Sequence, residues 1–378
     1  MSEPADQLEV AQEVVDNVPT DVEVEDPEAG VGHDPWDPEQ IRIHTKAYSL
    51  RHLMDMIDDG DVDLAPDFQR QYVWKDAQRW GLIESLLLGI PLPSFYFNEN
   101  REGLMQVVDG VQRLTTIHRF YKGEFSLGRL AYLKDLEGKQ FKDLDGSYRR
   151  RLQNTQFVAH VIDPETPFRV KFDVFKRINT GGSPLSAQEI RHCMSKAQSR
   201  DFLRALVDLT AFEDVMGKTV LNHPRMADRE IALRLVAFHI IPVEDYRQYE
   251  SLDSFLGVVT ERIDALSAGE LKKLEAVAER GLVNSRAVFG EFAFRKWPLT
   301  SARRNPINRT LVETWGTLLA EHPTTAVKAR AVELRRRARE MMTSNVAFID
   351  SISGGTGDVN KVTSRMTLVG DAIREYLG

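Results

Sequence analysis

Apolar residues in the first half of the chain recur at the spacing of helix faces, and short β-branched or aromatic runs lie between these segments. Leu82, Ile83, Leu86 and Leu87 share one face of a predicted helix, which Gly89-Ile90-Pro91 ends. Ser49 is predicted to cap the N-terminus of the helix that starts at residue 50. The pattern as a whole predicts helices over 50–57, 78–88, 111–121 and 168–178, and strands over 94–97, 104–108 and 157–162.

The pattern changes near residue 186. From Ser186 onward the periodicity is almost entirely helical, as in Phe202, Leu203, Leu206 and Leu209. Strands mixed with helices and then followed by helices alone indicate an α+β protein. We therefore expect a small mixed sheet with helices over 41–185 and a mainly helical domain over 186–378.

Residues 1–40 have a different composition, with thirteen Asp or Glu residues, several prolines and no Lys or Arg. Low hydrophobicity with charge of one sign predicts a disordered acidic arm that acts as a solubilising tail. A second interpretation is an arm that mimics DNA and occupies a basic groove until DNA or a partner displaces it. The full chain carries a net charge of −8, but the remainder has 49 basic and 44 acidic residues, so the body is mildly basic.

Other features of the composition narrow the class of protein. The chain has one cysteine, Cys193, which fits a reducing cytoplasm and excludes an internal disulfide. The most apolar stretch, 233–242, contains Arg234 and His239 and therefore predicts a core helix rather than a membrane span. The sequence contains no Walker loop, no dinucleotide-binding glycine fingerprint, no Gly-x-Ser-x-Gly and no His or Cys spacing typical of a metal site.

A first candidate site is the predicted turn Asp109-Gly110-Val111-Gln112-Arg113 between a strand and a helix. The free N–H groups and partial positive charge of a helix N-terminus attract phosphate, and Gly110 allows close approach of a ligand. Arg113 lies in the first helical turn, on the polar side, where its guanidinium can bind two phosphate oxygens. The alternative is an ordinary turn with Asp109 as the helix cap, because Asp-Gly pairs are common turn formers.

Two further stretches are candidates. Residues 66–74 place aromatic residues around Arg70, which suggests a base-stacking surface with a phosphate-binding Arg, or else a half-buried strand. Asn179-Thr180-Gly181-Gly182 should form a tight polar turn that can present N–H groups to an anion, or else a simple joint between helices. Ser186 and Glu189 then form a predicted capping box.

These stretches, in this order and spacing, resemble the N-terminal domain of GmrSD-type modification-dependent restriction proteins, within the ParB/sulfiredoxin-like superfamily. The characteristic motif of that family is Asp-Gly-Gln-Gln-Arg, and here Val111 replaces the first Gln. This departure puts the role of that Gln side chain in doubt and leaves the turn, the acid and the Arg intact. The resemblance covers roughly residues 41–320. The matching stretches are PDFQRQYVWK, LIESLLLGIPLPSFYF, VVDGVQRLTTI and VFKRINTGGSPLSAQEIR, with the later ADREIALRLVAF and FGEFAFRKW similar to members that lack a nuclease domain.

The resemblance implies that the 41–185 domain binds and hydrolyses nucleoside triphosphate and thereby controls DNA cleavage in phage defence. It implies DNA, a partner nuclease and further copies of the chain as partners, and no membrane. Asp109 and Gln112 would be catalytic, and Asp109 would hold Mg²⁺ or orient the attacking water. The residues expected to bind the nucleotide are Gln69, Arg70, Gly110, Arg113, Asn179, Gly181 and Gly182.

Two alternatives use the same residues differently. A metal-dependent DNA nuclease would need several carboxylates that converge on a metal, and Asp109 is the one strong candidate. A non-catalytic subunit would use the aromatic and Arg residues to bind DNA or a partner without turnover. No His-Asn-His nuclease pattern is recognisable in the C-terminal half.

Overall fold

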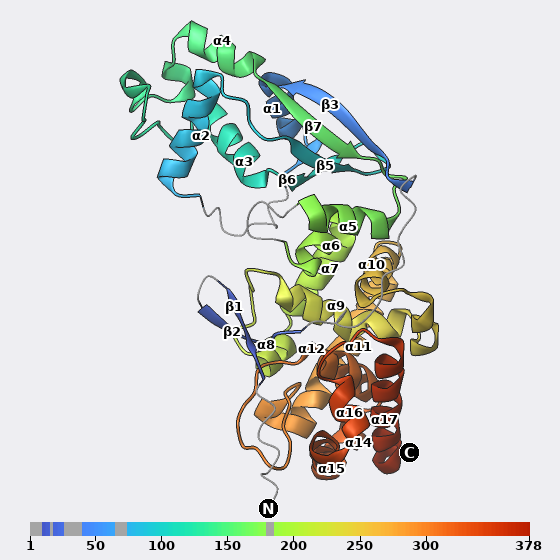
Figure 1. Cartoon of the computed structure of the whole chain (residues 1–378). Coiled ribbons are helices and arrows are strands. Elements are labelled where there is room, and N and C mark those ends of the chain that lie inside the picture. The colour runs from blue at the N-terminus through green and yellow to red at the C-terminus, as the bar shows by residue number, and fades with distance from the viewer. Residues whose placement is uncertain (1–9, 16–17, 26–39, 65–73, 179–184) are drawn as a thin grey trace, which may run out of the picture. The chain divides into compact units, whose positions relative to one another are not determined.

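The computed structural model describes residues 10–15, 18–25, 40–64, 74–178 and 185–378. The chain divides into two compact units (Figure 1). One, called here the sheet unit, is Pro35–Met194, and the other, the helical unit, combines Met1–Asp34 with Ser195–Gly378. The sheet unit is therefore inserted in the sequence of the helical unit.

The sheet unit contains a five-stranded mixed sheet, which confirms the predicted α+β class. The strand order is β3-β7-β5-β6-β4, with β5 parallel to β7, β4 parallel to β6 and antiparallel pairing elsewhere. The strands are β3 (Ile43–Ser49), β4 (Val62–Asp63), β5 (Phe95–Glu99), β6 (Met105–Asp109) and β7 (Gln156–Ile162).

The four helices predicted for the sheet unit begin and end within two residues of the predicted positions, whereas α4 was not predicted. Ser49 caps α1 by accepting from the His52 N–H, and Gly89 ends α2 in the left-handed conformation, both as predicted. Leu82, Ile83, Leu86 and Leu87 of α2 are buried in a core with the inward side chains of β5 and β6. The helices are α1 (Leu50–Asp58), α2 (Asp76–Leu88), α3 (Val111–Tyr121), α4 (Gly146–Asn154), α5 (Phe168–Ile178) and α6 (Ala187–Met194).

The helical unit has its own hydrophobic core, centred on α9 and α11. A π-helical turn, Val312–Gly316, interrupts the helical stretch between α12 and α13 and lies against both α9 and α11. The helices are α7 (Ala197–Val207), α8 (Thr210–Met216), α9 (Ala227–Ile240), α10 (Leu252–Ile263), α11 (Ala268–Phe289), α12 (Arg309–Leu311), α13 (Thr317–Ala320), α14 (Thr324–Ala329), α15 (Ala331–Ser344), α16 (Val346–Ser351) and α17 (Val359–Leu377).

The expectation of a disordered arm over residues 1–40 is wrong for residues 12–23. These residues form two antiparallel strands, β1 (Gln12–Val15) and β2 (Val18–Glu23). Val22 is fully buried in the core of the helical unit, and the Glu23 N–H donates to the Ile307 carbonyl at 2.9 Å. The physical reason is charge pairing, because acidic residues of this segment meet Arg and Lys residues of the helical unit at ion-pair distance.

The apolar stretch 233–242 lies largely within α9, whose side chains over 231–238 are buried. Arg234 forms ion pairs with Glu25 and Glu230 at 2.9 and 2.7 Å, which compensates its charge within the core. Among the helices that the structure describes, none combines the length and the apolar character needed to cross a bilayer.

Candidate functional site

The turn between β6 and α3 depends on a glycine. Gly110 has φ 99° and ψ 8°, a left-handed conformation that strains other residues. A Cβ at this position would also lie 2.3 Å from Cδ1 of Phe95. Gly110 is therefore required both by the backbone conformation and by the aromatic ring packed against it.

Among the described residues, no side chain caps the N-terminus of α3. The cap position is Gly110, and the neighbouring Asp109 carboxylate points to Arg113 instead of to the backbone N–H groups of the helix. The alternative in which Asp109 acts as an ordinary helix cap is therefore wrong. Within the described part of the chain, the N–H groups of the first turn of α3 have no side-chain cap, and the helix end keeps its partial positive charge.

Arg113 is held inside this turn. Its side chain is 14% exposed, and its Nη2 donates to Asp109 Oδ2 at 2.9 Å and to the Ser94 carbonyl at 3.1 Å. Its Nη1 donates to the Pro93 carbonyl, and the guanidinium lies over the Phe95 ring, 4.5 Å from the centroid. Burial lowers the pKa of Arg113 below its ordinary value, and the Asp109 charge opposes that shift. Arg113 is therefore held by acceptors of the β5 and β6 segments, while its contact with phosphate stays a prediction.

Two acceptors next to the helix N-terminus are available to a ligand. The Asp109 side chain is 38% exposed, and Arg113 occupies only its Oδ2. Oε1 of Gln112 is buried and has no hydrogen-bond partner among the described residues. An unpaired buried acceptor is unfavourable, so this oxygen is suited to accept a hydrogen bond from a bound molecule.

The structure brings together four of the predicted site residues, Asp109, Gly110, Gln112 and Arg113. The predicted nucleotide-binding residues Gln69, Arg70, Asn179, Gly181 and Gly182 lie outside the described residues. Their part in the site stays a prediction.

A comparison with protein families identifies this unit. Residues 50–195 match the family model of the GmrSD restriction endonuclease, N-terminal domain. This part of the chain belongs to that family. The match begins at the first residue of α1 and ends one residue after the sheet unit. The resemblance that the sequence suggested for the helical stretches up to residue 320 lies beyond this match. No curated protein matches the chain.

Three residues of the GmrSD-type domain support the site and were not identified from the sequence. Phe95 lies under Gly110 and Arg113, and the carbonyls of Pro93 and Ser94 accept from the Arg113 guanidinium. The signal in the sequence was the pair Pro93-Ser94 directly before β5, because a proline-containing entry leaves carbonyl groups outside the ladder of the sheet.

Helix α6 of the GmrSD-type domain packs against β6 with polar side chains that are buried. Its capping box is confirmed, since the Glu189 N–H donates to Ser186 Oγ at 3.1 Å and the Ser186 N–H donates to the Glu189 carboxylate. Arg191 is 1% exposed, and its Nε donates to Gln188 Oε1 at 2.9 Å. The strand that carries Asp109 therefore packs against a helix in which Glu189, Gln188 and Arg191 Nε take part in local hydrogen bonds.

Asp109 is the residue of the GmrSD-type domain that we predict to hold a metal ion. The described residues contain no group of three His, Cys, Asp or Glu side chains that could hold a metal ion. Mg²⁺ usually binds through one or two carboxylates, with substrate phosphates and water as its other ligands. Asp109 fits that kind of site, since its Oδ1 is not engaged by Arg113.

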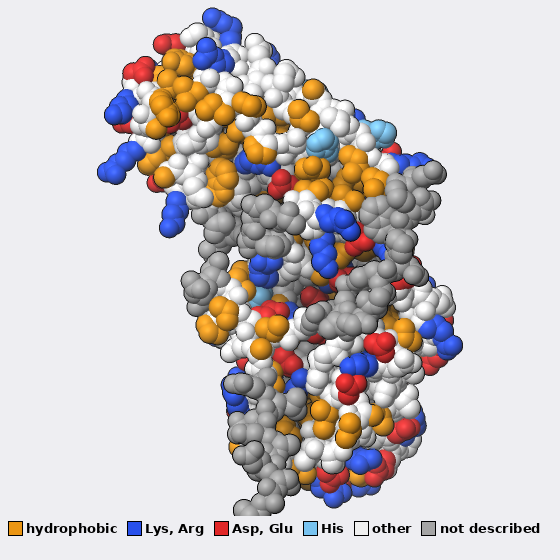
Figure 2. Space-filling view, viewed as in Figure 1, with side chains coloured by type: hydrophobic (Ala, Val, Ile, Leu, Met, Phe, Trp, Pro, Cys, Tyr) orange, Lys and Arg blue, Asp and Glu red, His pale blue; other side chains and the backbone are white. Residues whose placement is uncertain are grey.

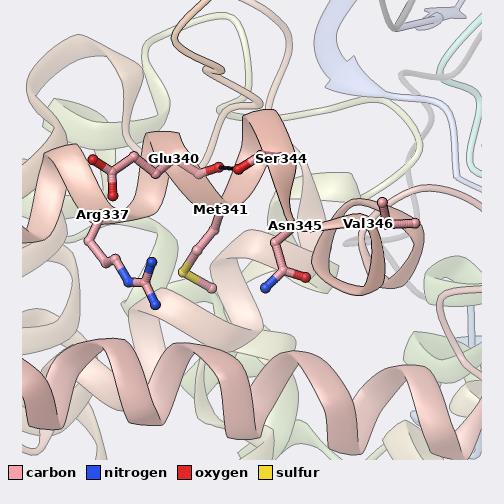
Figure 3. Close-up of a pocket in the computed structure, with 6 residues that line it drawn as sticks. All are labelled: Arg337, Glu340, Met341, Ser344, Asn345 and Val346. Atoms are coloured by element: carbon pink, nitrogen blue, oxygen red, sulfur yellow. Dashed lines mark hydrogen bonds between the residues drawn. The ribbon is translucent and has the colours of Figure 1, made fainter.

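A separate pocket lies in the helical unit, along α15 and the start of α16 (Figure 3). Its lining is mostly polar, and Arg337 on its wall forms an ion pair with Glu375 at 3.4 Å. Asp109, Gly110, Gln112 and Arg113 do not line it, so it is distinct from the β6–α3 turn. The lining residues are Arg337, Glu340, Met341, Ser344, Asn345 and Val346.

Proposed function

We propose that the GmrSD-type domain binds and hydrolyses a nucleoside triphosphate at the β6–α3 turn, and that turnover controls a partner nuclease in DNA restriction. The observation that carries this proposal is the N-terminus of α3, which no described side chain caps. Gln112 Oε1 beside it has no hydrogen-bond partner among the described residues. Free N–H groups suit phosphate oxygens, and a buried acceptor suits a donor group of a nucleotide. The family match supports the connection to restriction.

Each residue of the turn has a distinct role in this proposal. Phosphate oxygens would approach the first N–H groups of α3, while the Phe95 ring occupies the place of a side chain at Gly110. The Asp109 carboxylate would repel a triphosphate if it were alone, but its ion pair with Arg113 offsets this charge. Arg113 thus acts first as a positioning residue for Asp109, and its two remaining N–H groups can reach phosphate.

Asp109 and Gln112 are the proposed catalytic pair. Asp109 Oδ1 would accept a hydrogen bond from the attacking water and orient it, or would hold Mg²⁺. The metal, when bound, would offset the charge of the phosphate oxygens. Gln112 would position the nucleotide or the water through its free Oε1. Gln69, Arg70, Asn179, Gly181 and Gly182 are proposed to complete the nucleotide contacts.

Calorimetry and phosphate release with each of the common nucleoside triphosphates, with and without Mg²⁺ and DNA, test this function. Asp109→Asn should lower turnover more than binding, and Gln112→Ala should lower both. The matched control is Asp163→Asn. Asp163 directly follows β7, whose end lies at the opposite end of the strands from the end of β6. Its carboxylate pairs with His44. This control should leave nucleotide binding unchanged.

Assays of DNA cleavage and DNA binding with the same proteins address the alternative functions. DNA cleavage by the purified protein that is lost in Asp109→Asn would favour the nuclease. DNA binding without affinity for any nucleoside triphosphate would favour a non-catalytic subunit. Equal nucleotide binding by the wild-type protein, Asp109→Asn and Gln112→Ala would exclude the β6–α3 turn as the site.

A further inference from the structure

The N-terminal segment carries a row of carboxylates at every second position, Asp21, Glu23 and Glu25. Each has a cation of the helical unit as its own partner. Arg295 binds Asp21 through both terminal nitrogens, at 2.9 and 2.6 Å, and Arg304 lies 3.3 Å from the same carboxylate. The other two pairs are Lys296 with Glu23 at 2.7 Å and Arg234 with Glu25 at 2.9 Å.

The Glu25 carboxylate occupies a pocket built for an anion. Arg234 reaches it with both terminal nitrogens, at 3.1 and 2.9 Å. The hydroxyl groups of Thr310 and Thr356 also donate to it. A guanidinium with two hydroxyl groups around one oxyanion would bind a phosphate group equally well. The Arg234 pair and the neighbouring Arg309 lower the pKa of Glu25 against the effect of burial, so the carboxylate stays charged.

The charges of this network balance only with the N-terminal segment in place. Six cations of residues 195–378 take part in this network of ion pairs among the described residues. Only two acids of residues 195–378 pair with them, Glu230 and Glu313. Four acids of the N-terminal segment supply the rest, and without them the network would have a net charge of +4. The six cations are Arg234, Arg295, Lys296, Arg304, Arg309 and Arg365, and the four acids are Glu13, Asp21, Glu23 and Glu25.

The cations of this network are largely covered, with Arg304 as the exception at 46% exposed. Arg234, Arg295, Lys296, Arg309 and Arg365 are all buried, and β2 lies next to the start of α12 (Figure 1), where Arg309 Nη1 donates to the Glu23 carbonyl at 3.1 Å. On the face shown in Figure 2, by contrast, Lys and Arg side chains are interspersed with Asp and Glu over the helical unit. A group of buried cations of the unit therefore lies against its own N-terminal segment.

We propose that the row Arg234, Lys296, Arg295 and Arg304 is a nucleic-acid phosphate-binding surface, and that residues 18–25 are its resident, autoinhibitory occupant. Carboxylates at alternate positions of a strand are spaced about 7 Å apart, one charge per repeat of an extended backbone. A nucleic-acid strand also presents one charge per repeat, on its phosphates. Phosphates would take over the partners of Asp21, Glu23 and Glu25 as the segment leaves. The proposal does not rest on the nucleotide site of the sheet unit.

A purely structural strand gives the opposite expectation. Val22 is fully buried. The Glu23 N–H donates to the Ile307 carbonyl, and the Ile307 N–H donates to the Asp21 carbonyl. Removing one partner from a buried ion pair leaves an uncompensated charge and is strongly destabilising. If the strand never leaves, neutralising its carboxylates should destabilise the protein without opening a surface to DNA.

The decisive measurement is the affinity of the full chain for a labelled DNA oligonucleotide, as a single strand and as a duplex, over a range of salt concentrations without nucleotide. The combined variant Asp21→Asn, Glu23→Gln, Glu25→Gln should bind about tenfold or more tightly at low salt, and its log–log salt slope should steepen by about two to three if three phosphates are engaged. Comparison of single strand and duplex identifies the form that fits.

A charge-matched control separates a local site from net charge. The control variant carries Asp208→Asn, Glu244→Gln and Glu321→Gln, three exposed acids of the same unit, and should gain much less affinity. Adding Lys296→Gln and Arg304→Gln to the first variant should abolish its gain. Equal gains in the first variant and the control, or a gain that survives loss of the two cations, would show that the surface is not a DNA site.

Hydrogen exchange on the wild-type protein provides a test that needs no variant to fold. DNA bound at low salt should accelerate exchange at residues 18–25 and at the Ile307 amide, which donates to the Asp21 carbonyl at 2.8 Å. Exchange elsewhere in the helical unit should change little. Bound DNA with unchanged exchange at these amides, or no binding by the folded wild-type protein at the lowest salt, would overturn the proposal.

Discussion

At the scale of single residues, contacts with residues of another strand determine the conformation of the β6–α3 turn. Phe95 packs against Gly110 and under the Arg113 guanidinium, and Arg113 in turn holds the Asp109 carboxylate. A side chain whose terminal atoms are held by three acceptors keeps one orientation. The turn is therefore preorganised before any ligand binds, which is what a phosphate site at a helix N-terminus requires.

Gly110→Ala should lower the free energy of unfolding more than Gly103→Ala. Both glycines have positive φ, 99° and 83°, so both substitutions carry a backbone penalty of about 1–2 kcal/mol. Only at Gly110 does the new Cβ meet Phe95, while at Gly103 nothing lies within 4 Å. We expect an additional loss of about 1–3 kcal/mol for Gly110→Ala in urea unfolding, from overpacking. Equal losses would mean that the Phe95 contact relaxes freely.

Arg113→Ala should destabilise the sheet unit by about 1–3 kcal/mol, because the carbonyls of Pro93 and Ser94 and the Asp109 carboxylate lose their charged donor. The control is Arg119→Ala on the same helix, where the side chain is 34% exposed and pairs with Glu124. That substitution should change stability by about 0–1 kcal/mol. Urea unfolding with triphosphate calorimetry distinguishes the two roles. Unchanged stability with weaker binding would restore the interpretation of Arg113 as a free phosphate ligand.

At the scale of elements, a single buried carboxylate joins α2 to the loop that follows α3. Glu84 on α2 is 6% exposed and accepts backbone N–H groups from Ala131, Tyr132 and Leu133, at 3.0, 2.6 and 2.8 Å. Burial acts to raise the pKa of Glu84, but the three backbone donors outweigh it and lower the pKa below its ordinary value of 4.5. The charge on this carboxylate therefore stabilises the folded loop.

Glu84→Gln should make the sheet unit less stable at neutral pH, and the difference from wild type should shrink in acid. Because the folded pKa lies below the unfolded one, the contribution is complete above about pH 4.5 and is lost as the pH falls through the folded value. The measurement is the melting temperature of both proteins across this range. Glu102→Gln, at an exposed position, is the control and should follow wild type throughout. A difference independent of pH would assign the effect to shape rather than charge.

At the scale of the whole molecule, the first residues of the chain complete the unit formed by the last. Residues 18–25 bind residues near 234 and 295–309, while the GmrSD-type domain is inserted between these segments in the sequence. Burial also lowers the pKa of His223, beside Glu13, to about 4, so this side chain of the network is neutral near pH 7. The helical unit thus depends on both ends of the chain.

Deletion of residues 1–25 should lower the melting temperature of the helical unit. The deletion removes Val22 from the core and leaves Arg234, Arg295 and Lys296 without their N-terminal partners. Loss of even one partner of a buried pair typically removes about 3–5 kcal/mol, which corresponds to a shift on the order of 10 °C. Deletion of residues 1–9 is the control, since it removes acidic residues but none of these contacts. An unchanged melting temperature after the longer deletion would support the expectation that residues 1–40 form a disordered tail.

The sequence by itself determined the local elements of the sheet unit and the position of the candidate turn. Helices 111–121 and 168–178 begin and end at the predicted residues, and the capping box at Ser186 forms as expected. These features depend on residues within a few positions of one another, whose spacing is visible in the sequence. Strand β4, only two residues long, has too short a pattern to be predicted.

Only the tertiary structure decided which charges are satisfied and where they lie. Nothing near Asp21 in the sequence shows that its partner is Arg295, 274 positions away, so a segment with the composition of a disordered arm becomes a buried strand. Likewise, the periodicity of α3 places Arg113 on its polar side, while the carbonyls that bind it belong to Pro93 and Ser94 in another element. Periodicity specifies which face of an element is apolar, whereas charge pairing depends on which distant residues the fold brings within a few ångströms.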